Sequence, residues 1–552
     1  MPNVLENPLY YLDNFHQVLE WIGTRYGDLL TPEEHAFIVQ FAALPQAARA
    51  LFVRMVMRQG CLFRASKLVY GEIGDPHAAA APLLALGWVE NDPLLSLDQL
   101  FELLQKPEIG AVFALSGQQK AARKAEQREA LRARFPDPLR FSAWYRDDGE
   151  QVYQILAKPL CERLRLIFFG NFRQGWTEFV LSDLGVYKYE KVEFSAGSRG
   201  FRNRQDIDDY LALQRCRERF HDGQPLADVW REVAASQPDN ADNDWLASRR
   251  DKFLFQIGQE LEKSQDWDAA FELYASCAYP GARVRAIRVL EKSARDALAF
   301  EWLTRAWAAP ESETERQQLW RIAPRLRRKL GHARLAPAPA AGVPRVDLSL
   351  PPPATPCYVE GVVRDHLARA DAPVYYVENG LINSLFGLLC WSAIFKPIPG
   401  AFFHPFHRGP ADLHSADFQR RRARDFDACL DQLDSGGYRD TIWRNFAAKA
   451  GIQSPFVSWD LLDHALLALA LDCIPAAHLK KWCERILLDI KTNRCGFPDL
   501  IQFWPAEKRY RMIEVKGPGD RLQDNQKRWL DYCARHDMPV SVCYLQWSGA
   551  DD

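Results

Sequence analysis

Two short stretches near the C-terminus decide the fold: residues 496–504 read Gly-Phe-Pro-Asp-Leu-Ile-Gln-Phe-Trp, and residues 510–516 read Tyr-Arg-Met-Ile-Glu-Val-Lys. Both are short runs of apolar, aromatic and β-branched residues, the composition of β-strands. Pro505 and a polar pair separate them, so we expect an antiparallel hairpin with Asp499 opposite Glu514. Cβ atoms of directly opposed residues lie roughly 4.5–5.5 Å apart in such a hairpin.

This hairpin brings two like charges together. Opposed carboxylates destabilise a sheet, and a divalent cation between them would remove that cost. Lys516 projects from the same face as Glu514, because side chains alternate along a strand. Two acids and a lysine on one face are the set of side chains that a metal-dependent nuclease needs.

The neighbouring segments extend the hairpin into a larger core. Glu378 stands at the start of an amphipathic helix, where the helix dipole favours a carboxylate. Asp520 is the expected N-cap of a second helix over about 521–536, whose inward stripe includes the polar Gln526. A buried amide needs partners, which the carboxylate site would supply. A last strand runs through residues 540–544. Helix, strand, strand, helix and strand, with Asp and then Glu-x-Lys, form the pattern of the PD-(D/E)xK nuclease core.

The composition indicates a globular protein of several domains. The chain has 552 residues, 47% of them hydrophobic and 26% charged. Its formal net charge is −2, so contacts to nucleic acid must come from local basic patches. Twelve cysteines without a Cys-x-x-Cys pair argue against zinc fingers and redox motifs. The chain has no export signal and no stretch approaching about 20 apolar residues. We therefore expect a soluble intracellular protein.

The N-terminal part of the chain divides into three segments. Residues 1–96 have helical periodicity and two strand-like edges, compatible with a winged-helix unit or with plain helical packing. Residues 97–240 are mixed in pattern. Residues 241–335 read as successive helices, with one tetratricopeptide-like match at Trp267-x2-Ala270-x3-Tyr274.

A proline-rich segment over residues 336–356 is expected to be a semi-rigid linker. Residues 357–552 then form a separate domain. The fold class that we expect is multidomain, with a mostly α-helical N-terminal half and a C-terminal α/β domain of the PD-(D/E)xK type.

Basic side chains cluster in two places. The run from Lys120 to Arg134 contains only two acids, so it is either a solvated helix face or a phosphate-binding helix. The candidate phosphate contacts are Lys120, Arg123 and Lys124 in this run and Arg420, Arg421 and Arg494 in the C-terminal domain. His404-x2-His407 is interpreted either as a zinc site or as ordinary loop histidines.

The C-terminal domain resembles the VRR-NUC domain of the Fanconi anaemia-associated nuclease family. The similarity lies in residues 494–500, in residues 514–530, at Glu378 and in Val457-Ser458-Trp459-Asp460. It extends more loosely to residues 201–210 and to the Trp267 helix. The family layout of a SAP-type DNA-binding region, tetratricopeptide-like helices and a nuclease fits the segments above, with 97–240 as the SAP-type region. The chain has no Cys/His cluster for the ubiquitin-binding zinc finger of eukaryotic members, which indicates a bacterial member.

The resemblance implies cleavage of 5′-flap or other branched DNA, with 5′-to-3′ exonuclease activity, in interstrand cross-link repair. Carried over by position, Glu378, Asp499, Glu514 and the Val515 carbonyl would hold two Mg²⁺ or Mn²⁺ ions. Lys516 would orient or activate the attacking water, and Gln526 would support the ligands. We expect a cytoplasmic, nucleoid-associated protein that has no membrane contact and acts as a monomer or weak dimer.

Two other functions stay open at this point. One is a different nuclease task on the same core, such as junction resolution or restriction, although such enzymes are usually small symmetric dimers. The other is a non-catalytic DNA-binding scaffold, against which the complete set of three carboxylates and a lysine argues.

Overall fold

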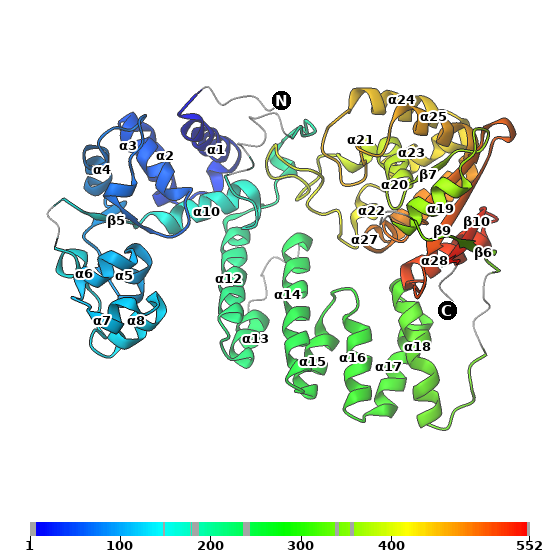
Figure 1. Ribbon diagram of the computed structural model, residues 1–552, viewed down its shortest axis with the longest axis horizontal. Coiled ribbons are helices and arrows are strands. Elements are labelled where there is room, and N and C mark those ends of the chain that lie inside the picture. The colour runs from blue at the N-terminus through cyan, green and yellow to red at the C-terminus, as the bar shows by residue number, and fades with distance from the viewer. Residues whose placement is uncertain are drawn as a thin grey trace. The chain divides into compact units, whose positions relative to one another are not determined.

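The computed structural model describes residues 7–146, 149–176, 178, 187–235, 243–336, 342–353 and 358–548 (Figure 1). The chain divides into two units, Met1–Tyr187 and Lys188–Asp552. Within the described ranges, every helix is too short or too polar to cross a lipid bilayer.

The first unit is built around a helical core and a small sheet. Its helices are α1 (Tyr10–Tyr26), α2 (Pro32–Ala43), α3 (Gln46–Val56), α4 (Pro76–Ala85) and α10 (Lys158–Phe169). Thr31 and Glu34 form a capping box that starts α2. The rings of Phe37, Phe52 and Trp88 then pack together in the interior, with the Phe37 and Trp88 centroids 4.5 Å apart.

The sheet of this unit contains the two predicted strand edges and one strand from elsewhere. Its order is β1 (Leu62–Arg64), β5 (Val152–Ile155) and β2 (Val89–Asn91), all antiparallel. The helical unit with strand edges is therefore present, but its central strand β5 lies far beyond the expected boundary at residue 96. Residues 1–96 do not complete the sheet by themselves.

A smaller helical region is inserted between β2 and β5. It contains β3 (Leu94–Leu95), α5 (Leu97–Leu103), α6 (Lys106–Val112), α7 (Gly117–Ala121), α8 (Lys124–Arg132), β4 (Leu139–Arg140) and α9 (Phe141–Trp144). The single basic helix expected here is wrong, because Ala122 and Arg123 have extended ψ angles of 156° and 151° and separate α7 from α8.

The second unit begins with a series of helices. They are α12 (Arg204–His221), α13 (Leu226–Ala235), α14 (Asp244–Lys263), α15 (Trp267–Ser276), α16 (Ala282–Lys292), α17 (Asp296–Ala308) and α18 (Glu313–Lys329). From α14 onward each helix packs against the next, as the tetratricopeptide-like pattern predicted. The buried Tyr274 ring of α15 lies against Gly258 of α14, where a Cβ atom would come within 2.6 Å of it.

The C-terminal sheet of the second unit has five strands, in the order β6 (Arg345–Leu350), β10 (Val540–Trp547), β9 (Arg509–Lys516), β8 (Leu500–Trp504) and β7 (Val374–Tyr376). Strand β10 is parallel to β6 and β9, whereas β8 is antiparallel to both β7 and β9. The expected linker over 336–356 is therefore wrong for residues 345–350, which form an edge strand. Their apolar residues alternate with polar ones, and Leu348 and Leu350 pack on the sheet.

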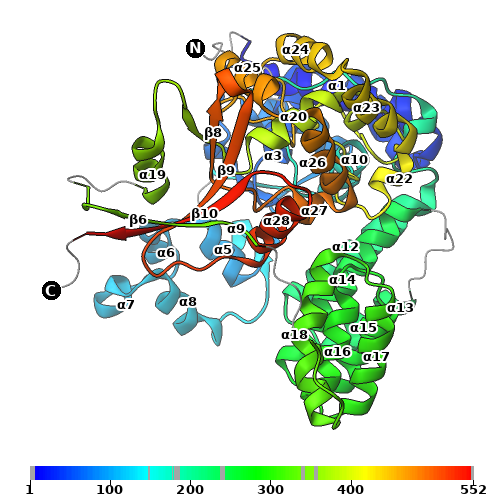
Figure 2. The same ribbon diagram turned by 90° about the vertical axis from the view of Figure 1, so that its right-hand side faces the viewer.

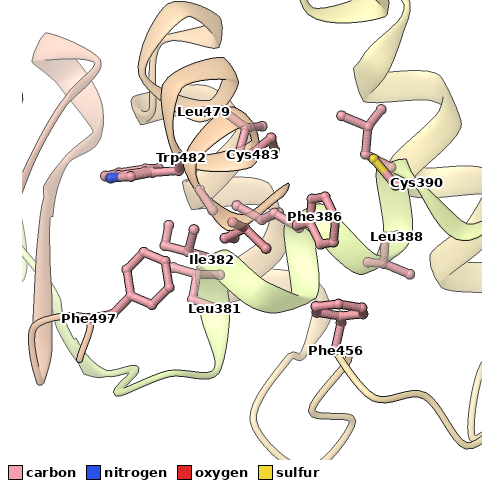
Figure 3. Packing of buried hydrophobic residues seen from close by; sticks show 14 of the residues in the cluster. Leu381, Ile382, Phe386, Leu388, Cys390, Phe456, Leu479, Trp482, Cys483 and Phe497 are labelled. Atoms are coloured by element: carbon pink, nitrogen blue, oxygen red, sulfur yellow. The ribbon is translucent and has the colours of Figure 1, made fainter. Parts of the chain in front are cut away.

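Helices cover both faces of this sheet (Figure 2). One face packs against α20 (Leu381–Leu389), α26 (Ala476–Leu488) and α28 (Asp524–Arg535), and the other against α19 (Val359–Leu367). Figure 3 shows α20 residues packed close to Trp482 and Phe497. The remaining helices of the domain are α21 (Trp391–Ile394), α22 (Phe418–Arg421), α23 (Ala423–Ser435), α24 (Tyr438–Ala448), α25 (His464–Cys473) and α27 (Ile490–Asn493).

Candidate active site

The hairpin of β8 and β9 has the predicted register. Leu500 pairs with Ile513 and Trp504 pairs with Arg509, so the next position places Asp499 opposite Glu514. Asp499 Oδ2 accepts a hydrogen bond of 2.8 Å from the Val515 backbone N–H. By strand alternation, Asp499 and Glu514 face the side of the sheet that α20 and α28 cover.

Both carboxylates are buried at this position. Asp499 is 6% exposed and Glu514 is 0% exposed. The pKa of Asp499 is raised to about 6, mainly by loss of solvation. The charge of Glu378 acts in the same direction, whereas the Val515 hydrogen bond and the Lys516 charge oppose the rise. Loss of solvation and the charge of Asp499 together raise the pKa of Glu514 to about 8. The two acids therefore share a site that disfavours their combined negative charge.

Lys516 supplies one positive charge to this site. Its Nζ lies 2.7 Å from Glu514 Oε1. Among the described residues, neither oxygen of Glu514 has a hydrogen-bond partner of good geometry. A buried carboxylate balanced by a single lysine beside two other acids costs folding free energy, and a bound cation would remove that cost.

Glu378 lies three residues before α20 and is exposed. Its loop is joined directly to the Asp499 loop, since the Val377 N–H donates to the Asp499 carbonyl at 2.8 Å. Asn379 Oδ1 also accepts hydrogen bonds from the N–H groups of Gly496 and Phe497, at 2.8 and 3.2 Å. These bonds hold Glu378 beside the hairpin acids, and its charge raises the pKa of both.

Two neighbours of Glu378 were not predicted from the sequence. The Tyr376 hydroxyl donates to Glu378 Oε2 at 2.6 Å, and Asn379 Nδ2 donates to Oε1 at 3.1 Å. The signal for Tyr376 was its position two residues before Glu378 at the end of a strand, which places both side chains on one face.

The donor atoms suit a divalent cation. Carboxylate and carbonyl oxygens are hard ligands that Mg²⁺ and Mn²⁺ prefer. In the described part of the chain, no three His, Cys, Asp or Glu side chains are gathered closely enough to surround a metal ion. Glu378 is engaged with Tyr376 and Asn379, so it would have to exchange these bonds for a metal contact.

Gln526 has a partner different from the expected one. It is buried on the inward stripe of α28 with Trp529, Leu530 and Cys533, as predicted. Its Oε1 accepts a 2.8 Å hydrogen bond from the Gln523 N–H, at the start of its own helix. Asp520 is not the N-cap, because α28 begins at Asp524 and Asp520 instead accepts a 3.0 Å hydrogen bond from the Gly517 N–H.

The basic residues of the first unit fall into two groups. Lys120 and Arg123 are exposed, whereas Lys124 Nζ donates to the Leu104 carbonyl at 2.8 Å. Arg128 Nε lies 3.3 Å and Arg132 Nη2 lies 3.2 Å from Oδ1 of Asp98 on α5. Glu129 of the run itself lies 3.1 Å from Arg132, and the fold supplies a second acid, Asp98, from another helix.

The basic residues of the C-terminal domain are also divided. Arg420 is 78% exposed at its side chain, whereas Arg421 pairs with Asp412 at 3.0 Å. The adjacent Arg422 is fully buried and donates to both oxygens of Asp412. Arg494 donates to the Pro455 carbonyl at 2.7 Å.

His404 is buried and His407 is partly buried, with their ring centroids 4.0 Å apart. Burial lowers the pKa of both rings. The Phe406 N–H donates to His404 and the Phe403 N–H donates to His407, so ring nitrogens of this pair stabilise their own loop.

Three family models match the chain. They are the "FAN1, HTH domain" over residues 9–90, the "Fanconi anemia-associated nuclease SAP domain" over residues 94–144, and the "VRR-NUC domain" over residues 434–547. The SAP match ends well before residue 240, the expected end of that region, and coincides with the insertion between β2 and β5.

Curated relatives match nearly the whole chain. A Fanconi-associated nuclease 1 homolog of Pseudomonas aeruginosa is 56% identical over 543 residues, which cover 98% of this chain and 97% of the relative. A homolog from Oryza sativa is 24% identical over 97% of this chain, which spans only 62% of the rice protein's length.

Two solved structures are similar over their full length. The crystal structure of paFAN1 bound to 5′-flap DNA with a 2-nucleotide flap and a gap has a TM-score of 0.92 and 56% identity, covering 100% of both chains. The corresponding complex with a 1-nucleotide flap has a TM-score of 0.89, covering 98% of this chain and 99% of the other.

Proposed function

Because the chain belongs to the Fanconi-associated nuclease family, it is a metal-dependent DNA nuclease, and we propose that it cleaves DNA carrying a 5′ flap. The similarity to paFAN1, whose crystal structures contain 5′-flap DNA, supports this substrate. The proposal includes 5′-to-3′ exonuclease activity and a role in interstrand cross-link repair. It places the protein at the nucleoid of a bacterial cytoplasm as a monomer or weak dimer.

One observation carries the catalytic part of the proposal. Asp499 and Glu514 are opposed and buried, and the described residues offer the Glu514 oxygens no hydrogen-bond partner of good geometry. In a purely structural ion pair, protein donors would satisfy both Glu514 oxygens. In a metal site, lone pairs of these oxygens stay available for the bound cation. We therefore assign Glu378, Asp499, Glu514 and the Val515 carbonyl as ligands of two Mg²⁺ or Mn²⁺ ions.

The roles of the protein side chains follow from their contacts. When bound, the metal ions would supply hydroxide at neutral pH and stabilise charge on the phosphate and the leaving oxygen. The Val515 N–H fixes one oxygen of Asp499 and leaves the other available. Lys516 holds Glu514 at 2.7 Å, and its ammonium group is available to orient the attacking water or to contact the scissile phosphate.

DNA binding is proposed to use exposed basic side chains. Lys120 and Arg123 in the first unit and Arg420 in the second are exposed. Lys124, Arg421 and Arg494 are weaker candidates, because each already donates to a protein oxygen. Phosphate contacts of this kind contribute affinity that falls with increasing salt.

The Asp499→Ala variant tests this proposal. We expect it to lose Mg²⁺- and Mn²⁺-dependent cleavage of an end-labelled 5′ flap while it retains its affinity for the same DNA. Glu507→Ala is the matched control, because Glu507 is an exposed acid in the turn of the same hairpin.

The substrate is tested with the wild-type protein on 5′-flap, 3′-flap and four-way-junction DNA. The 5′ flap is expected to be cut fastest. Undiminished cleavage by Asp499→Ala would eliminate the site, and faster cutting of the four-way junction would eliminate the substrate assignment.

A further inference from the structure

A fully buried arginine lies behind the loop that carries Asp499. Arg485 of α26 is 0% exposed, and its Nη2 donates to Glu313 Oε2 of α18 at 2.5 Å. Its guanidinium carbon lies 4.4 Å from the ring centroid of Trp529 and 4.2 Å from that of Tyr532, both on α28. Within the described ranges, its Nε and Nη1 have no hydrogen-bond partner.

The contacts of Arg485 lead to Asp499 through two aromatic rings. Trp529 stacks on Phe497, with ring centroids 4.0 Å apart and an interplanar angle of 29°. Phe497 stands two residues before Asp499, and Trp529 Nε1 also donates to the Cys495 carbonyl at 3.2 Å. The Arg485 guanidinium therefore packs on one side of an indole whose other contacts hold the Asp499 loop.

The backbone of Arg485 contacts the beginning of the same loop. Its carbonyl accepts a 2.8 Å hydrogen bond from Asn493 Nδ2. Asn493 is the last residue of α27, directly before the segment that leads to Asp499. Arg485 thus has one connection to each end of this segment.

Stability alone does not account for a charge at this position. Burying a guanidinium costs several kcal/mol, and replacing a buried ion pair with apolar side chains is often neutral or stabilising. Glu313 is only partly buried, with 31% of its side chain exposed, so the pair is not optimised as an interior salt bridge. Because Arg485 is fully buried, it also has no surface from which to contact DNA.

We propose that Arg485 is a positioning residue for the nuclease reaction. Held by Glu313, it packs Trp529 against Phe497 and so fixes the loop that ends at Asp499. Because Glu313 is the first residue of α18, which is labelled in Figure 1, the helical region before the nuclease domain contributes to the geometry of the active site through the Glu313–Arg485 contact. The inference rests on the proposed role of Asp499 as a metal ligand.

The Arg485→Met variant tests the proposal in the full-length protein. At saturating protein, the single-turnover rate of 5′-flap cleavage should fall roughly 10- to 100-fold, as for other residues that orient metal ligands. The Mg²⁺ concentration for half-maximal rate should rise. The affinity for flap DNA measured without divalent metal should be unchanged, and the thermal midpoint should be unchanged or higher.

Arg321→Met is the matched control. Arg321 also joins α18 to α28, through Asp524, but its side chain is 53% exposed and its described contacts do not include Trp529 or Phe497. It should show the wild-type rate and the wild-type Mg²⁺ dependence.

Two further variants keep the proposal testable if Arg485→Met does not fold. Glu313→Gln weakens the hold on Arg485 and should lower the cleavage rate without weakening DNA binding. Phe497→Leu removes the stacked ring, and the double variant with Glu313→Gln should lose little more activity than the worse single variant, because both act along one path.

Several results would overturn the inference. One is a cleavage rate for Arg485→Met within about twofold of the wild-type rate, because differences of that size are found between unrelated, additive changes. A second is a slower cleavage rate that weaker DNA binding fully explains. A third is a double variant whose fold-loss of cleavage rate equals the product of the two single fold-losses. If Asp499→Ala also cleaves normally, the proposed function fails as well. If Asp499→Ala is inactive and Arg485→Met is fully active, only the positioning role fails.

Discussion

The acidic hairpin around Asp499 and Glu514 and the basic run from Lys120 to Arg134 are both charged segments, but the fold treats them differently. The hairpin carboxylates are buried, and Lys516 is the one cation paired with Glu514 among the residues that the structure describes. In the basic run, the half-exposed Arg128 and Arg132 share one acid, Asp98, from another helix. Exposed pairs of this kind contribute about 0–1 kcal/mol. A buried charge without a full set of partners therefore indicates function more strongly than a run of exposed charges.

The largest effect that sharpens this comparison is expected for Glu514→Gln. In the wild-type protein, the pKa of the Glu514 carboxyl rises from 4.5 in the unfolded chain to about 8 in the metal-free folded state. Between these values the folded state holds a proton that the unfolded state has lost, so the free energy of unfolding falls as the pH rises. Glutamine carries no charge, so the variant should lose cleavage activity but be more stable than wild type at pH 8.5 without metal.

Thermal unfolding with and without Mg²⁺ measures this effect. The wild-type midpoint should fall by a few degrees between pH 6 and pH 8.5 without metal and recover with Mg²⁺, which binds the folded state. The midpoint of Glu514→Gln should change less with pH and with Mg²⁺. If Glu514→Gln were less stable than wild type at pH 8.5 in the absence of metal, the Glu514 charge would not destabilise the folded state, and this prediction would be wrong.

The smaller effect concerns the basic run. Lys120 is exposed, and none of its described side-chain contacts is an ion pair, whereas Arg128 lies 3.3 Å from Asp98. Lys120→Ala should weaken flap binding and reduce the slope of log K against log salt by about 1, the value for one phosphate contact. Arg128→Ala should leave the slope unchanged. Equal changes in both variants would show that pairing with Asp98 does not withdraw Arg128 from DNA.

The sequence predicted features that depend on local periodicity. The hairpin register followed from strand alternation across a short turn, and the buried stripe of α28 followed from helical spacing. These patterns placed Asp499, Glu514 and Lys516 on one face. The family resemblance added Glu378 to this set of candidate metal ligands, and in the structure its loop is hydrogen-bonded to Asp499.

Features that depend on contacts between distant segments were missed. Strand β5 completes a sheet whose other strands precede the inserted helices, and β6 pairs with β10 across nearly the whole nuclease domain. The Asp98 partner of Arg128 was missed for the same reason, since charge partners depend on tertiary packing. Local sequence contains no signal for such pairings.

The most direct test of the central claim, that the buried hairpin acids form a metal site, is a crystal of the protein soaked in Mn²⁺ and measured for anomalous scattering. The account predicts two anomalous peaks bounded by Asp499, Glu514 and the Val515 carbonyl, with Glu378 turned from Tyr376 toward one of them. A map with no peak between Asp499 and Glu514, or with Mn²⁺ bound only elsewhere, would contradict it.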